Sequence, residues 1–296
     1  MLSKEQIESF WRDGFIVAKD AVNARQLAAL REVLAGWVDE SRVHEAPFGE
    51  PTVDGRPRFD LAPEHTAAAP ALRRVNNPSE VDDAYMEAMR DSAMTDMVAD
   101  LIGPDVKHHH CKINLKLPGS NTEVRYHQDF AYTPHTNDDV VTALLMVDDM
   151  TPENGCLMAV AGSHRGPMLS LFEGDRFTGF VAPEEERSLR AHEEPILGRA
   201  GDVCLMHTRL AHGSEPNRSP SSRGLYICVY SAADAFPIAR NPMPSRNEGM
   251  IVRGRPTRRA RLCEATVELP EQPIRASFFA VQEEASTAPS IPGSGR

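Results

Sequence analysis

The sequence predicts a mainly β protein with flanking helices, in which short strands form a sandwich or barrel. Three observations lead to this fold class. From His108 onward, polar and apolar residues alternate with a period of two, which is typical of strands that bury one face. Turn residues separate the short strands that follow, whereas the first hundred or so residues repeat their apolar positions at helical spacing. So many short strands in about 170 residues favour an antiparallel architecture over a parallel α/β sheet.

Helices are expected in the N-terminal third of the chain. Ser3 can cap a first helix, and Gln6 completes a capping box three residues later. A second helix is predicted over about 23–38, where leucines form one apolar stripe, and helical periodicity returns over about 80–101. The stretch 44–70 is rich in proline, glycine and charge, and is therefore predicted to be a loop.

Strands are predicted along most of the remaining chain. After the alternating segment that begins at His108, we expect further strands over residues 140–147, 156–160, 202–207 and 224–231. Asn154-Gly155 is the strongest hairpin signal in the chain, because this dipeptide favours a two-residue turn between paired strands.

The chain is expected to form one domain over residues 1–285. Its helical part covers about 1–105 and its β core about 106–285, and the small, polar, proline-rich residues 286–296 are predicted to be a disordered tail. Hydrophobic residues make up 41% and charged residues 25%, which is an ordinary globular mixture. The net charge of −11 argues against a partner that is a nucleic acid or an anionic membrane, because both repel a negative surface.

Cysteine usage and the N-terminal sequence favour a cytoplasmic protein. The five cysteines are odd in number and form no CxxC pair, so zinc-ribbon and redox motifs are poorly supported. The first ten residues lack the basic and then apolar pattern of a signal peptide, and no apolar stretch approaches the ~20 residues of a membrane span. A monomer or a homodimer is compatible with these features.

A candidate metal site begins at His127 and Asp129. Residues i and i+2 of a strand point to the same face, so both side chains can approach one ion. His212 is the best third ligand from a distant strand. Two histidines and one carboxylate on one face of an octahedron suit non-haem Fe(II) and leave three open positions, which a bidentate 2-oxo acid and then O2 can occupy.

The His-x-Asp pair alone is a weak signal, since the chain has 11 histidines and 43 acidic residues. Downstream residues strengthen it. Arg223 follows His212 by eleven residues, so an antiparallel return could point its guanidinium into the same barrel, where it can pair with a distal carboxylate. Ser214 lies on the same strand face as His212 and can donate its hydroxyl to that carboxylate. Three consecutive histidines at 108–110 look like a second metal cluster, but alternate strand faces prevent them from binding one ion.

Several motifs resemble the phytanoyl-CoA dioxygenase family, to which the bacterial ectoine hydroxylases belong. In chain order they are FWRDGFIV at 10–17, HQD at 127–129, NGCLMAVAGSHRG at 154–166, HGSEPNRS at 212–219 and Arg223. The resemblance covers about residues 5–235, and the ordered series of motifs is quite specific.

This resemblance implies a double-stranded β-helix, the jelly roll or cupin-like barrel, with helices on one outer face. It also implies Fe(II) as the metal, bound by His127, Asp129 and His212, with 2-oxoglutarate and O2 as cosubstrates. Polar residues on the strand before the His-x-Asp pair help to hold 2-oxoglutarate in such relatives, which indicates Asn114 and, less closely, Lys112 beside Arg223 and Ser214. Related halogenases have a small residue in place of the carboxylate, so Asp129 favours hydroxylation.

The expected reaction is hydroxylation of an unactivated carbon of a free small molecule, for example a natural-product intermediate, with release of succinate and CO2. Candidate substrate-binding residues are Phe130, Tyr132 and His135, and the insert 168–195 is a candidate lid. Desaturation, epoxidation or cyclisation with the same cofactors are alternatives. A cupin-like metal enzyme that does not use 2-oxoglutarate, and a catalytically silent binding barrel, are further alternatives.

Overall fold

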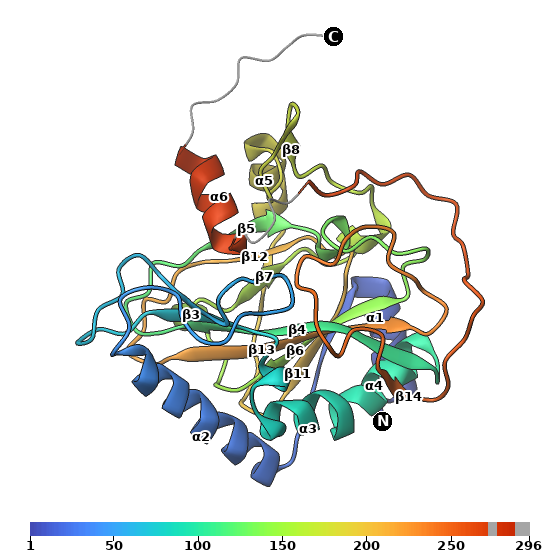
Figure 1. Cartoon of the computed structure of the whole chain (residues 1–296). Coiled ribbons are helices and arrows are strands. Elements are labelled where there is room, and N and C mark those ends of the chain that lie inside the picture. The colour runs from blue at the N-terminus through green and yellow to red at the C-terminus, as the bar shows by residue number, and fades with distance from the viewer. Residues whose placement is uncertain (272–276, 288–296) are drawn as a thin grey trace.

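The computed structural model describes residues 1–271 and 277–287, which form two antiparallel sheets with helices around them (Figure 1). The order of the large sheet is β1-β11-β6-β13-β4-β3-β2, and β14 pairs with β4. Its strands are β1 (Phe15–Ala18), β2 (Phe59–Leu61), β3 (Leu72–Asn76), β4 (Val106–Lys116), β6 (Val140–Met146), β11 (Val203–His207), β13 (Arg223–Ala232) and β14 (Ile251–Arg253). The small sheet has the order β10-β7-β12-β5. Its strands are β5 (Val124–His127), β7 (Leu157–Ala159), β10 (Glu194–Ile196) and β12 (His212–Ser214). The predicted mainly β fold class is confirmed.

Two hydrophobic cores lie on opposite faces of the large sheet. Strand β6 contributes to both, with Ala143 and Leu145 in the core that contacts the helices, and Leu144 and Met146 in the core that contacts the small sheet. A strand covered on both faces is expected to be apolar at nearly every position. This explains the run VVTALLM, in which Thr142 is the one polar residue.

Four helices cover the outer face of the large sheet: α1 (Lys4–Asp13), α2 (Ala24–Ser41), α3 (Asp83–Asp91) and α4 (Ala93–Ile102). Figure 1 shows α2, α3 and α4 below the sheet, on the face away from β5 and β12. The capping box of Ser3 and Gln6 is present, and Asn23 caps α2 in the same way. The helical region predicted over 80–101 is divided at Ser92, whose extended backbone ends α3 and caps α4.

Two predictions about loops and turns were wrong. The stretch 44–70 contains β2, which pairs with β3 at the edge of the sheet. Asn154-Gly155 does not join two paired strands, because β6 and β7 belong to different sheets. Instead Asn154 ends the 3-10 turn Pro152–Asn154 and Gly155 adopts a left-handed conformation with φ of 72°. The preference of Gly155 for a left-handed backbone is therefore used where the chain passes from one sheet to the other.

Gly155 is expected to be intolerant of a side chain. A Cβ built there would lie 2.3 Å from the carbonyl oxygen of Glu215, and the left-handed backbone adds strain. We expect Gly155→Ala to cost about 2 kcal/mol or more, and therefore to lower the Tm by roughly 4–8 °C. Gly174→Ala is the matched control for thermal unfolding, since Gly174 has φ of 61° but no atom within 4 Å of its Cβ position. Equal Tm losses in both variants would show that the contact with Glu215 is unimportant.

The C-terminal helix α6 (Phe278–Thr287) lies beside β5, on the side of the molecule away from α2, α3 and α4 (Figure 1). Ion pairing of Arg73 with Glu283, at 2.8 Å, attaches it to β3. Gln282 donates to the carbonyl of Gly179 at 2.7 Å, which attaches it to the 168–195 insert. The helix includes the first two residues of the predicted tail, and residues 288–296 of that tail lie outside the described part of the chain.

The 168–195 insert contains a small hairpin and one helix. The hairpin pairs β8 (Phe172–Glu173) with β9 (Arg176–Phe177), and α5 (Pro183–Arg190) follows. Within residues 1–271 and 277–287, no helix combines the length and the apolar character that a membrane span requires.

Candidate metal centre

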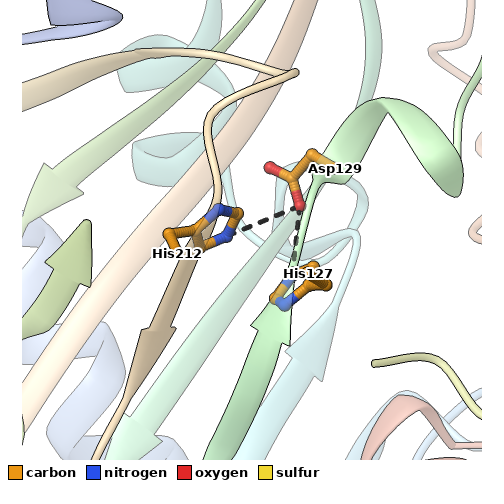
Figure 2. A group of neighbouring side chains, drawn as sticks. All are labelled: His127, Asp129 and His212. Carbon is orange, nitrogen blue, oxygen red and sulfur yellow. Dashed lines mark ion pairs between the residues drawn. The ribbon is translucent and has the colours of Figure 1, made fainter. Parts of the chain in front are cut away.

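His127, Asp129 and His212 converge at the open end of the small sheet (Figure 2). His127 ends β5, His212 begins β12, and the two are direct partners in the strand pairing. Asp129 begins a short 3-10 turn immediately after β5. Its Oδ1 lies 3.4 Å from Nε2 of His127 and 3.8 Å from Nε2 of His212. Among the residues that the structure describes, this is the group of potential ligands compact enough to hold one metal ion.

Neighbouring groups orient each candidate ligand. The Nδ1 atom of His127 lies 2.8 Å from the carbonyl oxygen of Arg125, and that of His212 lies 2.9 Å from the carbonyl oxygen of Leu210. An Nδ1–H donated to these carbonyls leaves both Nε2 lone pairs facing the centre of the site. Thr142 on β6 donates its hydroxyl to Oδ2 of Asp129 at 2.7 Å, which leaves Oδ1 for the metal.

The protonation states also suit a cation. Burial lowers the pKa of His212 to about 4, so its imidazole is neutral at physiological pH. Burial alone would raise the pKa of Asp129, but His212, His127 and Lys112 more than offset it and hold that pKa far below its ordinary value. A divalent metal requires imidazole nitrogens with a free lone pair and an ionised carboxylate, and a set of two histidines and one carboxylate suits Fe(II). The donor set therefore fits the metal that the sequence implied.

Thr142 is expected to tune the metal affinity through Asp129. Thr142→Val keeps the shape of the side chain but removes the hydroxyl, so we expect iron affinity to fall roughly 10- to 100-fold, the usual loss for an outer-shell partner. The dissociation constant can be measured by anaerobic iron titration. Thr142→Ser retains the donor and should bind iron as the wild type does. A Thr142→Val protein with wild-type affinity would contradict an orienting role for the hydroxyl.

The residues predicted to hold 2-oxoglutarate line the same cavity as the three ligands. The lining includes Arg223, Ser214, Asn114 and Lys112. Arg223 is 3% exposed, and its Nε has no hydrogen-bond partner in the described structure. Burial lowers the pKa of Arg223 to about 10, which still leaves a cation at neutral pH. A buried guanidinium with an unused donor fits a carboxylate ligand.

Ser214 and Asn114 each use one hydrogen-bonding function within the protein. Lys116 donates to the hydroxyl oxygen of Ser214 at 2.7 Å, so the serine hydrogen remains available to a carboxylate. Arg74 donates to Oδ1 of Asn114 at 2.9 Å, so the amide NH2 of Asn114 remains available to the cavity. Both side chains are thereby presented to the cavity as donors.

The predicted substrate-binding residues separate into two places. Tyr132 lines a second part of the cavity beside Asp129, whereas Phe130 and His135 line a different cleft with residues 262–267. The rings of Phe278 on α6 and Phe177 in the insert pack against Tyr132, with centroid distances of 5.5 and 5.6 Å. The insert and α6 together cover this side of the site.

Three residues of the site were missed in the sequence: Arg74, Thr142 and Phe278. Thr142 could have been found as the polar residue of an otherwise apolar strand. Arg74 belongs to β3, a short strand between β4 and the edge strand β2, and the sequence pattern did not predict it. Phe278 has no local signal, since it reaches the site only because α6 folds back across the molecule.

The remaining histidines are not metal ligands, although His110 lines the part of the cavity that contains Tyr132. In the His108–His110 series, Nδ1 of His109 lies 2.8 Å from Nδ1 of His110, and the ring of His108 packs on Tyr230 instead. His207 packs on Phe10 and His164, away from the metal ligands. None of these belongs to the ligand group among the described residues.

The two sheets carry two histidines, one carboxylate and a buried arginine in one cavity. These features define a 2-oxoglutarate-dependent dioxygenase, with iron and 2-oxoglutarate as its cofactors. The family model of phytanoyl-CoA dioxygenase (PhyH) matches residues 10–225. The chain belongs to this family, and the resemblance and the jelly-roll fold expected from the sequence are confirmed.

Relatives and solved structures agree with this assignment. The chain is 34% identical over 203 residues to a protein of Stutzerimonas stutzeri named "Probable alpha-ketoglutarate-dependent hypophosphite dioxygenase", covering 67% of this chain and 71% of the relative. It is 27% identical over 248 residues to an ectoine dioxygenase of Sphingopyxis alaskensis, covering 78% and 76%. The crystal structure of EctD from S. alaskensis with bound Fe has the same fold, with a TM-score of 0.67, 21% identity and coverage of 86% and 88%.

Proposed function

We propose that this dioxygenase hydroxylates an unactivated carbon of a free small molecule and releases succinate and CO2. The observation that carries the proposal is the position of buried Arg223, with an unused donor, in one cavity with all three metal ligands. The carboxylate of Asp129 occupies the position that is small in related halogenases, which favours hydroxylation. Relatives named for ectoine, L-proline and hypophosphite support a small, polar substrate.

Each residue then has a role. His127, Asp129 and His212 would hold Fe(II), which together with 2-oxoglutarate and O2 supplies the oxidising power for the reaction. Arg223, with Ser214 beside it, would bind the distal carboxylate of 2-oxoglutarate. Both line the part of the cavity that contains the metal ligands, whereas Tyr132 lines the other part.

Asn114 on β4 would complete the cosubstrate site as a donor. Tyr132, held by its hydrogen bond to the carbonyl of Gly179, would form a wall of the substrate side. Phe278 covers both parts of the cavity and would exclude water from the reacting carbon.

An anaerobic titration with Fe(II) and 2-oxoglutarate tests the cofactor part of the proposal. We expect a weak visible charge-transfer band when both are bound, and succinate when O2 is admitted. Candidate small molecules are then compared by how strongly they stimulate succinate formation, and mass spectrometry of the product should show the gain of one oxygen atom. A product that has lost two hydrogens would instead identify desaturation or cyclisation with the same cofactors.

Two other functions give different results in the same experiment. A cupin-like metal enzyme would turn over its substrate without 2-oxoglutarate, and a binding barrel would form no succinate with any substrate. The buried, unused donor of Arg223 disfavours both, since a site without a carboxylate ligand would leave this cation uncompensated.

A further inference from the structure

The cavity beside the metal ligands has two lobes. Arg74, Lys112, Asp129 and Phe278 border both lobes. The first lobe contains Arg223 and the metal ligands, and the second extends away from them toward Tyr132, Arg56 and Met243. The second lobe has a volume of about 40 Å³, which is room for only a few water-sized groups.

Charges in this cavity do not balance without a further anion. On the proposed function, Fe(II) carries +2, Asp129 −1, Arg223 +1 and 2-oxoglutarate −2, which sum to zero. Arg56 in the second lobe is already paired with Asp54 at 2.5 Å. Arg74 and Lys112 remain as two positive charges, and Asp129 is the one carboxylate in the lining of either lobe.

Arg74 is held rigidly but has an unused donor. It is 3% exposed, and Nε donates to Asn114 at 2.9 Å. Its guanidinium lies over the rings of Phe278 and Phe279, at 5.0 and 4.5 Å from their centroids. Nη2 is buried without a hydrogen-bond partner, and no carboxylate of the described residues forms an ion pair with Arg74. Burial lowers its pKa to about 9, and the nearby charge of Asp60 offsets only part of this effect.

Lys112 is also a cation without a hydrogen-bond partner among the described residues. Its ammonium has no hydrogen bond or ion pair to any described residue, and it lies 6.0 Å from the ring centroid of Phe278. Burial and the neighbouring charge of Arg74 lower its pKa to about 8. An uncompensated buried cation is costly, so two of them in one small cavity indicate a ligand that supplies negative charge.

We propose that Arg74 and Lys112 form an oxyanion subsite of the second lobe, and that the substrate is a small molecule with a carboxylate, phosphonate or phosphinate group bound there. The planar guanidinium can offer two parallel donors to such a group, and the ammonium of Lys112, which lines the same lobe, adds another. This inference rests on the proposed function, because it assigns Arg223 to 2-oxoglutarate. It extends that function by specifying that the substrate is an anion and that its anionic group binds to the enzyme.

The test measures anion binding to the anaerobic enzyme loaded with Fe(II) and 2-oxoglutarate. Acetate, methylphosphonate and hypophosphite are the probes, and neutral acetamide is the uncharged comparison. Binding is followed by calorimetry and by the shift of the visible charge-transfer band. We expect at least one of the three anions to bind and acetamide not to bind, and the anion that binds best identifies the head group.

Arg74→Met removes the charge but keeps much of the side-chain volume, and should raise the dissociation constant of that anion at least about 30-fold. Its affinity for 2-oxoglutarate should fall far less than that of Arg223→Ala, because Arg74 acts on the cosubstrate only through Asn114. Arg74→Lys should recover part of the anion affinity. Lys112→Met is a second test of the same subsite, and Arg218→Met, at an exposed position, should bind the anion as wild type does.

Three results would overturn the proposal: no probe anion binds the loaded wild type, both methionine variants bind it normally, or Arg74→Met loses 2-oxoglutarate as severely as Arg223→Ala does. The last would assign Arg74 to the cosubstrate. Failure of the proposed function is distinguishable, because it would remove the charge-transfer band and succinate from the wild type, whereas calorimetry would still report anion binding. Thermal unfolding of each variant confirms that it is folded.

Discussion

Replacing His212 with alanine is expected to abolish both iron binding and turnover. Loss of this imidazole leaves one histidine and one carboxylate, and the buried Nε2 of His212 is a ligand that no neighbouring side chain can replace. The loss of iron affinity should exceed the roughly 10- to 100-fold cost of losing an outer-shell partner such as Thr142. Anaerobic iron titration measures the affinity, and succinate formation measures turnover at saturating 2-oxoglutarate.

His192→Ala is the matched control for this variant. His192 is exposed after α5 and its Nδ1 lies 3.1 Å from the carbonyl oxygen of Ser188, so its loss should change neither iron binding nor succinate formation. Iron bound by the His212→Ala protein with wild-type affinity would exclude His212 as a ligand. Activity that returned with excess iron would show that His212 contributes affinity but is dispensable for the reaction.

The metal ligands could be predicted from sequence because strand geometry is local. His127 ends β5 and Asp129 begins the 3-10 turn two residues later, so both lie close together, and His212 is the direct cross-strand partner of His127. That pairing could not be derived from the chain alone. The order of motifs in the family resemblance supplied it, as it supplied the expectation that Arg223 lies in the same cavity.

The substrate side could not be predicted, because its residues come from segments whose docking is decided by tertiary contacts. Arg74 belongs to a short strand next to the edge of the large sheet, and Phe278 belongs to a helix attached by an ion pair and a side-chain hydrogen bond. Gly155 illustrates the same limit for turns. Its sequence correctly indicated a left-handed residue, but whether that turn joins neighbours in one sheet or crosses to another depends on strands far away in sequence.

Arg223→Ala should raise the KM for 2-oxoglutarate by about 100-fold or more, since removing one partner of a buried charge pair costs roughly 2–5 kcal/mol. Arg223 is fully enclosed near the ligands, so water cannot replace its guanidinium. Iron affinity should be unchanged, because Arg223 makes no contact with the metal ligands among the described residues. The KM is measured by succinate formation at fixed substrate concentration, and the iron affinity by titration without 2-oxoglutarate.

A lysine variant of Arg223 separates the effect of charge from that of geometry, and a variant of Arg218 provides the control. Arg223→Lys keeps the charge but loses the paired donors, so its KM should lie between those of wild type and Arg223→Ala. Arg218→Ala removes an exposed arginine from the loop before β13 and should leave the KM unchanged. A wild-type KM in Arg223→Ala would exclude this residue from the cosubstrate site. It would also weaken the charge balance from which the anionic substrate follows, since Arg223 would then be a third uncompensated cation beside Arg74 and Lys112.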